Sequence, residues 1–284
     1  MTKSWSLFAL LAFAIAPALL GWQETLTPDH PGPVPEVAPF AATFKIGWSE
    51  IEAAKARAEI SYNGTQIALD AGGGSEGLAR SLYQLDATFH GTVDRSTLHT
   101  LRSDQVETYA DRSLTTIVTG SNGALRTLSE RKPPGEKPAK WKDVKVQPVR
   151  DFFAGMLFIR SQPLASGDTV RLLMFPGGSS FFVEIKSAGP CTIDLADGPR
   201  EALRLDLKIQ RVNTKKGNAL EPHSKFRSGK IWLSNDTERI PLRAEVDIFI
   251  GYVFAEIVDY RQTGEVPALP PAKNGVDKSP VAER

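Results

Sequence analysis

The chain has 284 residues, of which 41% are hydrophobic and 24% are charged, so it has enough apolar residues to bury a core. Lys and Arg number 34 against 33 Asp and Glu, and this balance lacks the basic excess typical of nucleic-acid-binding proteins. The single cysteine excludes a disulfide framework and cysteine-rich metal sites, and the four histidines are scattered. We therefore expect no metal, no other cofactor and no nucleic-acid partner.

Residues 1–21 have the pattern of an export signal. Lys3 follows the amino terminus, the stretch Leu7–Ile15 is apolar, and small residues flank Pro17. Because the stretch is shorter than the ~20 residues that span a bilayer, it favours a cleaved signal peptide over a membrane anchor. We expect cleavage near residues 18–21, and a periplasmic or secreted protein with no stable membrane anchor afterwards.

Two proline-rich segments flank the expected domain. Residues 22–39 contain five prolines and predict an extended linker. Residues 263–284 combine Pro with Ala, Lys and Glu without apolar periodicity, and this composition predicts a disordered tail. A similar stretch at 131–142 predicts a solvated loop. A single β-rich domain is therefore expected between residues 40 and 262.

Alternation of apolar and polar residues dominates this domain, and such alternation predicts an antiparallel sheet. Asn63-Gly64 and Asn122-Gly123 are typical of two-residue hairpin turns, whose central positions favour positive φ. Gly189-Pro190 predicts a further turn between two strands. Many short strands at close spacing favour a mainly β fold, with a strongly curved sheet or half-barrel and two short helices. Beyond the first hairpin, strands are expected at 86–93, 97–108, 113–119, 124–131, 169–175, 180–187, 191–195, 202–212, 229–233, 240–250 and 252–262.

The two helices have different apolar patterns. Glu76–Leu85 places three leucines, Leu78, Leu82 and Leu85, on one face. Asp151–Arg160 is apolar nearly all round, so we expect it to be buried, and its first residue offers a carboxylate that can cap the helix. A buried helix beside a concave sheet would fill or line a half-barrel.

One short segment matches a catalytic motif. Gly73–Gly77 contains Ser75 and matches the G-x-S-x-G nucleophile elbow, between a predicted strand and a predicted helix. Asp151 or Asp194, followed by His223, would supply the acid and the base. A hydrolase of this type needs a parallel sheet, however, whereas this chain has hairpins, so a glycine-rich turn explains the same residues. We expect no enzyme, and a serine hydrolase using Ser75 and His223 is the alternative.

Large apolar and aromatic residues are dense in the second half of the chain. An ordinary core explains most of them. The functional alternative is a concave apolar cavity for a lipid-like ligand or an acylated partner. The candidate ligand-binding residues are Phe153, Leu157, Phe182 and Phe249.

Polar residues in three segments carry a resemblance to a known family. The chain resembles the bacterial exported family of domain of unknown function 3108 (DUF3108) over about residues 40–262. The matching residues are Asp151, Arg160, Gly167, Asp168, Ser234, Asp236, Arg239 and Pro241. The resemblance implies an envelope protein with an antiparallel sheet and brings no established activity. The expected architecture is also similar to the half-barrels of lipoprotein carriers, which bind acyl chains, although a fold does not determine a function.

The chemistry of the matched residues favours structural roles. Asp236 suits a hairpin turn, and Ser234 can bond a neighbouring backbone group. Pro241 lacks a donor, which predicts a position at a sheet edge. Asp151 and Arg160 are expected to tie the two ends of their helix to the sheet.

These observations predict an exported, soluble, non-enzymatic β-rich protein whose curved sheet holds an apolar or acylated ligand. The serine hydrolase is one alternative to this prediction, and a structural or scaffolding role without a ligand, with an envelope protein as partner, is the other.

Overall fold

The computed structural model describes residues 21–133, 138–223, 226 and 228–269. The predicted signal peptide, apart from Gly21, and the end of the predicted tail, residues 270–284, lie outside the described residues. Within the described part, the chain forms one antiparallel sheet of 15 strands with two α-helices. The predicted fold class, a mainly β chain with a curved antiparallel sheet, is therefore confirmed.

The sheet has two halves in chain order. The first half contains β1 (Phe40–Trp48), β2 (Ile51–Asn63), β3 (Gln66–Ser75), β4 (Leu85–Asp94), β5 (Thr100–Tyr109), β6 (Ser113–Ser121), β7 (Ala124–Lys132) and β8 (Lys142–Asp143). The second half contains β9 (Thr169–Met174), β10 (Phe181–Leu195), β11 (Gly198–Asn213), β12 (Ala219–Pro222), β13 (Gly229–Ser234), β14 (Pro241–Asp247) and β15 (Tyr252–Gln262).

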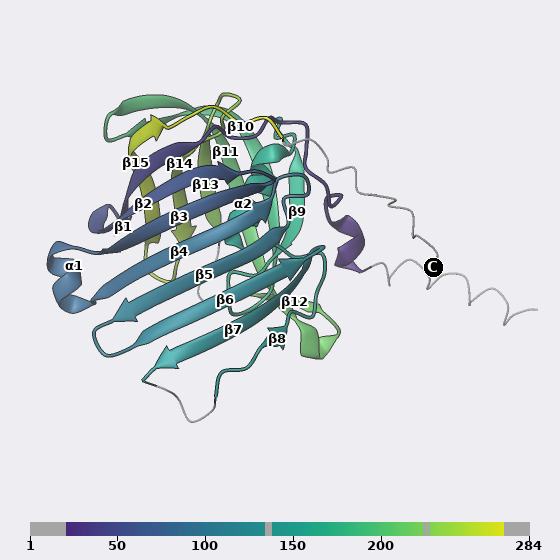
Figure 1. The fold of residues 1–284 in the computed structure, drawn as a ribbon. Helices are drawn as coiled ribbons and strands as arrows, with labels where there is room; N and C mark the ends of the chain where they lie inside the picture. Colours follow the sequence, from purple (N-terminus) through teal and green to yellow (C-terminus); the bar gives the residue numbers. More distant parts are fainter. Residues whose placement is uncertain (1–20, 134–137, 224–225, 227, 270–284) are drawn as a thin grey trace, which may run out of the picture.

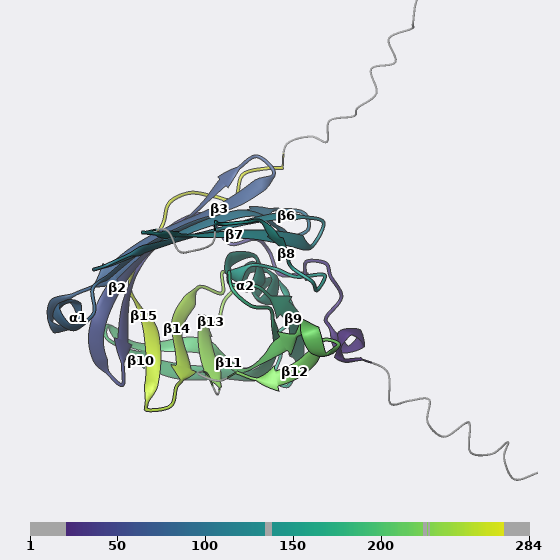
Figure 2. The same ribbon diagram turned by 90° about the horizontal axis from the view of Figure 1, so that it is seen from below.

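The two halves are joined through the first and last strands of the domain. The order is β8-β7-β6-β5-β4-β3-β2-β1-β15-β14-β13-β11-β10-β9, and β12 pairs with β11. The first and last strands, β1 and β15, are thus neighbours in the middle of the sheet. The sheet curves so strongly there that the two halves face each other, with α2 (Phe152–Ser161) between them (Figures 1 and 2).

The hairpins follow the predicted turns with two differences. Asn122 and Gly123 form a two-residue loop with φ of 48° and 76°, as an Asn-Gly turn requires. In the first hairpin the loop is Gly64-Thr65 instead, because Asn63 still pairs with Gln66. The predicted turn at Gly189-Pro190 is wrong. β10 continues through Gly189 and Pro190, and a β-bulge between Ser187 and Gly189 shifts the register of its pairing with β11.

The two helices also differ from each other in burial. α1 (Gly77–Leu82) is shorter than predicted, since Tyr83 has extended backbone angles and Leu85 begins β4. Its Leu78 and Leu82 are 78% and 80% exposed, so the leucine face is not a core face. α2 is buried along nearly its whole length, as its all-round apolar sequence predicts.

Two segments outside the strands and α-helices complete the fold. Residues 22–39 begin with a 3-10 helix (Trp22–Thr25) and pack on the domain, where the Trp22 ring meets Phe182 at a centroid distance of 5.4 Å. A second 3-10 helix covers Thr214–Lys216.

Pro241 is the first residue of β14, which lies between β13 and β15, so the predicted edge position is wrong. A proline is tolerated there because a strand's first residue, at a register shift, need not donate to the ladder. In the described residues, no helix combines the length and apolar character needed to cross a membrane.

Candidate ligand-binding cavities

Two cavities lie between the halves of the sheet. The first has a volume of about 700 Å³ and the second about 320 Å³, and both sizes are typical of small-molecule sites. Phe152, at the start of α2, and Pro176, in the loop between β9 and β10, line both of them. The N-terminal end of α2 and this loop therefore separate the two spaces.

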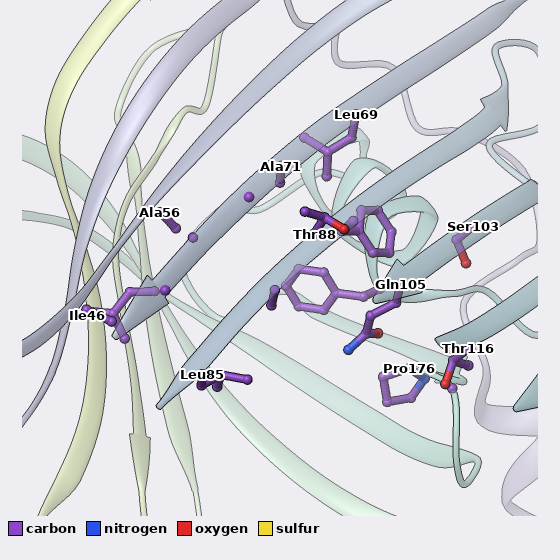
Figure 3. A pocket seen from close by; sticks show the side chains of 18 of the residues that line it. Ile46, Ala56, Leu69, Ala71, Leu85, Thr88, Ser103, Gln105, Thr116 and Pro176 are labelled. Carbon is purple, nitrogen blue, oxygen red and sulfur yellow. The ribbon is translucent and has the colours of Figure 1, made fainter. Parts of the chain in front are cut away.

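The first cavity exists because small residues cover the concave face of the first half. Ala56 on β2 pairs with Gly73 on β3, and Ala54 pairs with Ser75 in the next row. All four line the cavity, together with Ala71 (Figure 3). Alternation along the strand turns the charged neighbours to the outer face. Side chains this short cannot reach across the space that the curvature encloses.

At Gly73, the backbones of β2 and β3 leave no room for a side chain. A Cβ atom at this position would lie 2.4 Å from the carbonyl oxygen of Lys55 and 2.8 Å from the Cα of Ala56. Both are backbone atoms, which cannot rotate away. The position therefore requires glycine, and the G-x-S-x-G sequence has a packing role here.

One group of polar residues in the first cavity comes from β5 and β6, beyond β4, and from the N-cap of α2. Ser103 and Gln105 lie on β5, and Thr116 on β6 is the cross-strand partner of Gln105. The amide nitrogen of Gln105 donates to Glu107 at 2.5 Å, and the Tyr109 hydroxyl donates to the same carboxylate. This hydrogen bond and burial raise the pKa of Tyr109 above its usual range. One side of the cavity is thus apolar and the other can form hydrogen bonds.

Asp151 links this polar side to α2. Its Oδ1 accepts a hydrogen bond from the amide of Ala154 at 2.8 Å, which caps the helix, and its own amide donates to the hydroxyl of Thr100 at 2.9 Å. The residue is 2% exposed, and its Oδ2 has no hydrogen-bond partner within the described part of the chain. Burial raises the pKa of this carboxyl. The structure thus buries a carboxyl oxygen at the edge of the cavity without satisfying it.

The second cavity has a wall of larger side chains. On its concave face, β11 and β13 present Leu205 opposite Ile231, with further leucines and isoleucines along the same strands. From α2, Phe153 and Leu157 line this cavity, so two of the four predicted ligand-binding residues lie here. Met156, which was not among the four, lies beside them.

The other two predicted ligand-binding residues lie elsewhere. Phe182 packs in a core cluster with Trp22, and it is not a lining residue of either cavity. Phe249 is 81% exposed in the turn between β14 and β15. Aromatic density alone did not separate lining residues from core residues. The signal that could have located the first cavity is the alternation of alanine and glycine in β2 and β3.

Two of the matched polar residues, Arg160 and Arg239, meet at the C-terminal end of α2. The guanidinium of Arg160 donates to three backbone carbonyls, those of Pro35 (2.7 Å), Thr237 (3.0 Å) and Glu238 (2.8 Å). Arg239 returns from the turn between β13 and β14 and donates to the carbonyls of Arg160 (2.8 Å) and Gln162 (2.6 Å). The two arginines therefore fasten the end of the helix to this turn.

Ser234 and Asp236 shape the turn itself. The Oδ1 of Asp236 accepts from the Ser234 hydroxyl (2.7 Å) and from the Arg239 amide (2.9 Å). The Ser234 hydroxyl oxygen accepts in turn from the amide of Ile240 at 2.9 Å. Asp168 caps a separate turn before β9, where it accepts from the amide of Ala165 at 2.8 Å. All these contacts hold the backbone.

The serine and the histidine of the hydrolase alternative lie in different halves of the sheet. Ser75 is next to α1, and its hydroxyl oxygen accepts a hydrogen bond from the amide of Leu85 at 3.1 Å. His223 follows β12 and stacks on Phe226 at a centroid distance of 4.6 Å. α1 and β12 are on opposite sides of the molecule in both views (Figures 1 and 2). Of the two acids, Asp151 caps α2, and Asp194 lies near the end of β10.

The metal-binding side-chain types are not clustered in the described residues. None of their His, Cys, Asp and Glu side chains form a group of three or more that could hold a metal ion.

One solved structure is similar to this chain in fold. A β-barrel-like protein of domain of unknown function DUF1849 from Brucella abortus superposes with a TM-score of 0.51 at 9% identity, covering 80% of this chain and 98% of that one. This similarity concerns the fold alone. A protein inferred to be exported, with a YmcC-like fold, from Bacteroides fragilis aligns with a TM-score of 0.35 at 6% identity, over 82% of this chain and 99% of that chain.

The sequence comparisons identify a family. No curated protein matches the sequence. The family model DUF3108, a protein of unknown function, matches residues 41–258, which are most of the chain and nearly the whole sheet. The resemblance seen in the polar segments is thereby confirmed, and the chain belongs to the DUF3108 family.

Proposed function

We propose that this protein binds an apolar ligand, such as the acyl chain of a lipid or of an acylated partner, inside its curved sheet and without catalysing a reaction. The observation that carries the proposal is the first cavity, about 700 Å³ in volume and walled by alanine and glycine. A location in the cell envelope is part of the proposal, and the pattern of residues 1–21 supports it.

The size of the cavity is the main support. Protein interiors are packed about as densely as organic crystals, and voids larger than a water molecule are few. A space of this size beside a well-packed helix exceeds an ordinary packing defect. Water in contact with its apolar wall is displaced favourably by an apolar ligand, since burial of apolar surface drives binding.

The surroundings of the cavity provide a route of entry. Ala79 and Tyr83, in and directly after α1, line the cavity. The neighbouring Leu78 and Leu82 are exposed. A ligand approaching α1 therefore meets apolar side chains before it reaches the wall of β2 and β3.

The test is a matched pair of substitutions on β2. Ala56→Phe places a ring in the cavity, and we expect it to weaken the binding of a fluorescent fatty acid by about tenfold or more, because the ring occupies the ligand's space. Arg57→Phe introduces the same ring one residue away, on the outer face, and should leave binding unchanged. Lipid extraction and mass spectrometry of the purified wild-type protein should also recover a bound lipid.

Equal binding by the two variants would contradict this site. A protein that is reproducibly empty and binds no fatty acid would remove the proposal and favour a scaffolding role.

A further inference from the structure

The first cavity has a polar side and an apolar side, and this division bears on the kind of ligand it accepts. Ser103, Gln105 and Thr116 lie on adjacent strands at one side (Figure 3). The opposite side is the wall of Ala56 and Ala71 with their neighbours (Figure 3). A ligand that satisfies both sides has an apolar chain and a head that can form hydrogen bonds.

The charges around the cavity restrict this head further. Of the lining residues, Lys55 and Asp151 are the two that carry a formal charge among the Asp, Glu, Lys and Arg types. Lys55 follows the outward alternation of β2: its side chain is half exposed and is ion-paired with Glu76 at 3.2 Å and with Glu52 at 3.5 Å. No arginine or lysine of the lining therefore faces the polar side. An anionic head buried there would be without a counter-charge, which costs much free energy.

Two carboxyl groups make this side still less suitable for an anion. Glu107 accepts the hydrogen bond from Gln105, and Asp151 lies at the cavity edge with its Oδ2 unpartnered. A phosphate or carboxylate offers acceptors alone, in a place where acceptors are already in excess.

Building on the proposed function, we infer that the first cavity holds a single-chain amphiphile with an uncharged, hydroxyl-bearing head, of the monoacylglycerol type. Its chain lies along the alanine and glycine wall of β2 and β3. Its head donates to and accepts from Ser103, Gln105 and Thr116.

The experiment compares ligands that share one chain and differ in the head. Dodecane, monolauroylglycerol, laurate and dodecyl phosphate are competed against an uncharged fluorescent acyl-chain probe on the delipidated protein near neutral pH, where laurate is ionised. We expect monolauroylglycerol to bind about three- to tenfold tighter than dodecane, as one or two hydrogen bonds supply. Laurate and dodecyl phosphate should bind more weakly than monolauroylglycerol.

Variants identify the contacts. Gln105→Leu and Ser103→Ala should lower the affinity for monolauroylglycerol towards that for dodecane, while the affinity for dodecane is unchanged or rises. Gln262→Leu makes the first substitution on an exposed side chain outside the cavity and should change neither affinity.

The outcomes separate the two proposals. Equal affinity for all four ligands, or tightest binding of laurate or dodecyl phosphate, overturns the inference and leaves apolar binding in place. Failure of all four to bind overturns both.

Discussion

In both halves of the sheet, residues alternate between the inner and the outer face, but the inner faces enclose cavities of different volume. In β2 and β3 the inward positions are occupied by Ala56, Ala71 and Gly73, and the enclosed space is about 700 Å³. In β11 and β13 they are occupied by residues such as Leu205 and Ile231, and the space is about 320 Å³. Alternation decides which face is inward, whereas the volume of the inward side chains decides whether that face packs or encloses a cavity.

α2 packs against both halves of the sheet. Its Phe158 and Ile159 share a core cluster with Val183 and Leu203 of the second half. The bulky half therefore supplies much of the packing that holds the helix. The first half packs against the other side of the helix, where Phe153 and Leu157 share a second core cluster with Ile67 and other residues of that half. It adds a polar contact at the N-terminal end, where the Asp151 amide donates to Thr100.

The largest expected effect comes from making the second half resemble the first. Leu205 is fully buried and lines the second cavity. Leu205→Ala should lower the free energy of unfolding by about 3 kcal/mol, because it removes packed methyl groups and enlarges a void. Urea denaturation measures this change. Leu78→Ala, at an exposed leucine, should change stability by less than about 0.5 kcal/mol. A loss below about 1 kcal/mol for Leu205→Ala would contradict the packing difference.

A smaller effect is expected where α2 meets the first half. Asp151→Ala removes the helix cap and should cost about 1 to 2 kcal/mol of unfolding free energy, whereas Asp151→Asn keeps an oxygen that can accept from Ala154. Burial raises the pKa of Asp151 in the folded protein. The stabilisation by this carboxyl is then fully present below its ordinary pKa and declines as the pH rises through the raised value.

The stability of the wild type relative to Asp151→Asn should therefore fall as the pH rises from the acid range towards neutrality. Urea unfolding of both proteins across this range measures the difference. A difference that is constant, or that grows with pH, would show that burial does not control this carboxyl.

The smallest expected effect comes from filling the first cavity. Ala71→Leu should change the unfolding free energy by less than about 1 kcal/mol, because the added atoms enter available space. Ala202→Leu makes the same substitution at a fully buried position of the core and should cost about 1 to 3 kcal/mol. Thermal unfolding of the two variants compares them. Similar losses at both positions would mean that the first half is packed like the second.

Much of the fold could be predicted from local patterns. The Asn122-Gly123 turn and the buried helix α2 with its Asp151 cap follow from turn chemistry and apolar periodicity. The predicted turn at Gly189-Pro190 failed because a bulge accommodates the same residues once a long partner strand is present. A glycine and a proline mark an irregular backbone, but the neighbouring strand decides whether the chain reverses there.

The candidate site was less predictable. Phe153 and Leu157 line a cavity while Phe182 and Phe249 do not, although all four are large apolar residues of the second half. Their difference depends on what packs against each of them. Arg160 and Arg239 could be singled out as a pair of motif residues, yet their shared attachment to one end of α2 required the strands between them to fold.

By itself, the amino-acid sequence determined the family, the antiparallel β class and the inward and outward faces of most strands. These properties depend on residue type and on a period of two, which are local. Only the tertiary structure decided that β1 and β15 meet, that the sheet bends around α2, and that the small residues of β2 and β3 face a space that no side chain fills. A cavity is a difference between the volume enclosed by distant elements and the volume of their side chains. The small residues of β2 and β3 indicate the second volume locally, whereas the first exists only in the folded chain.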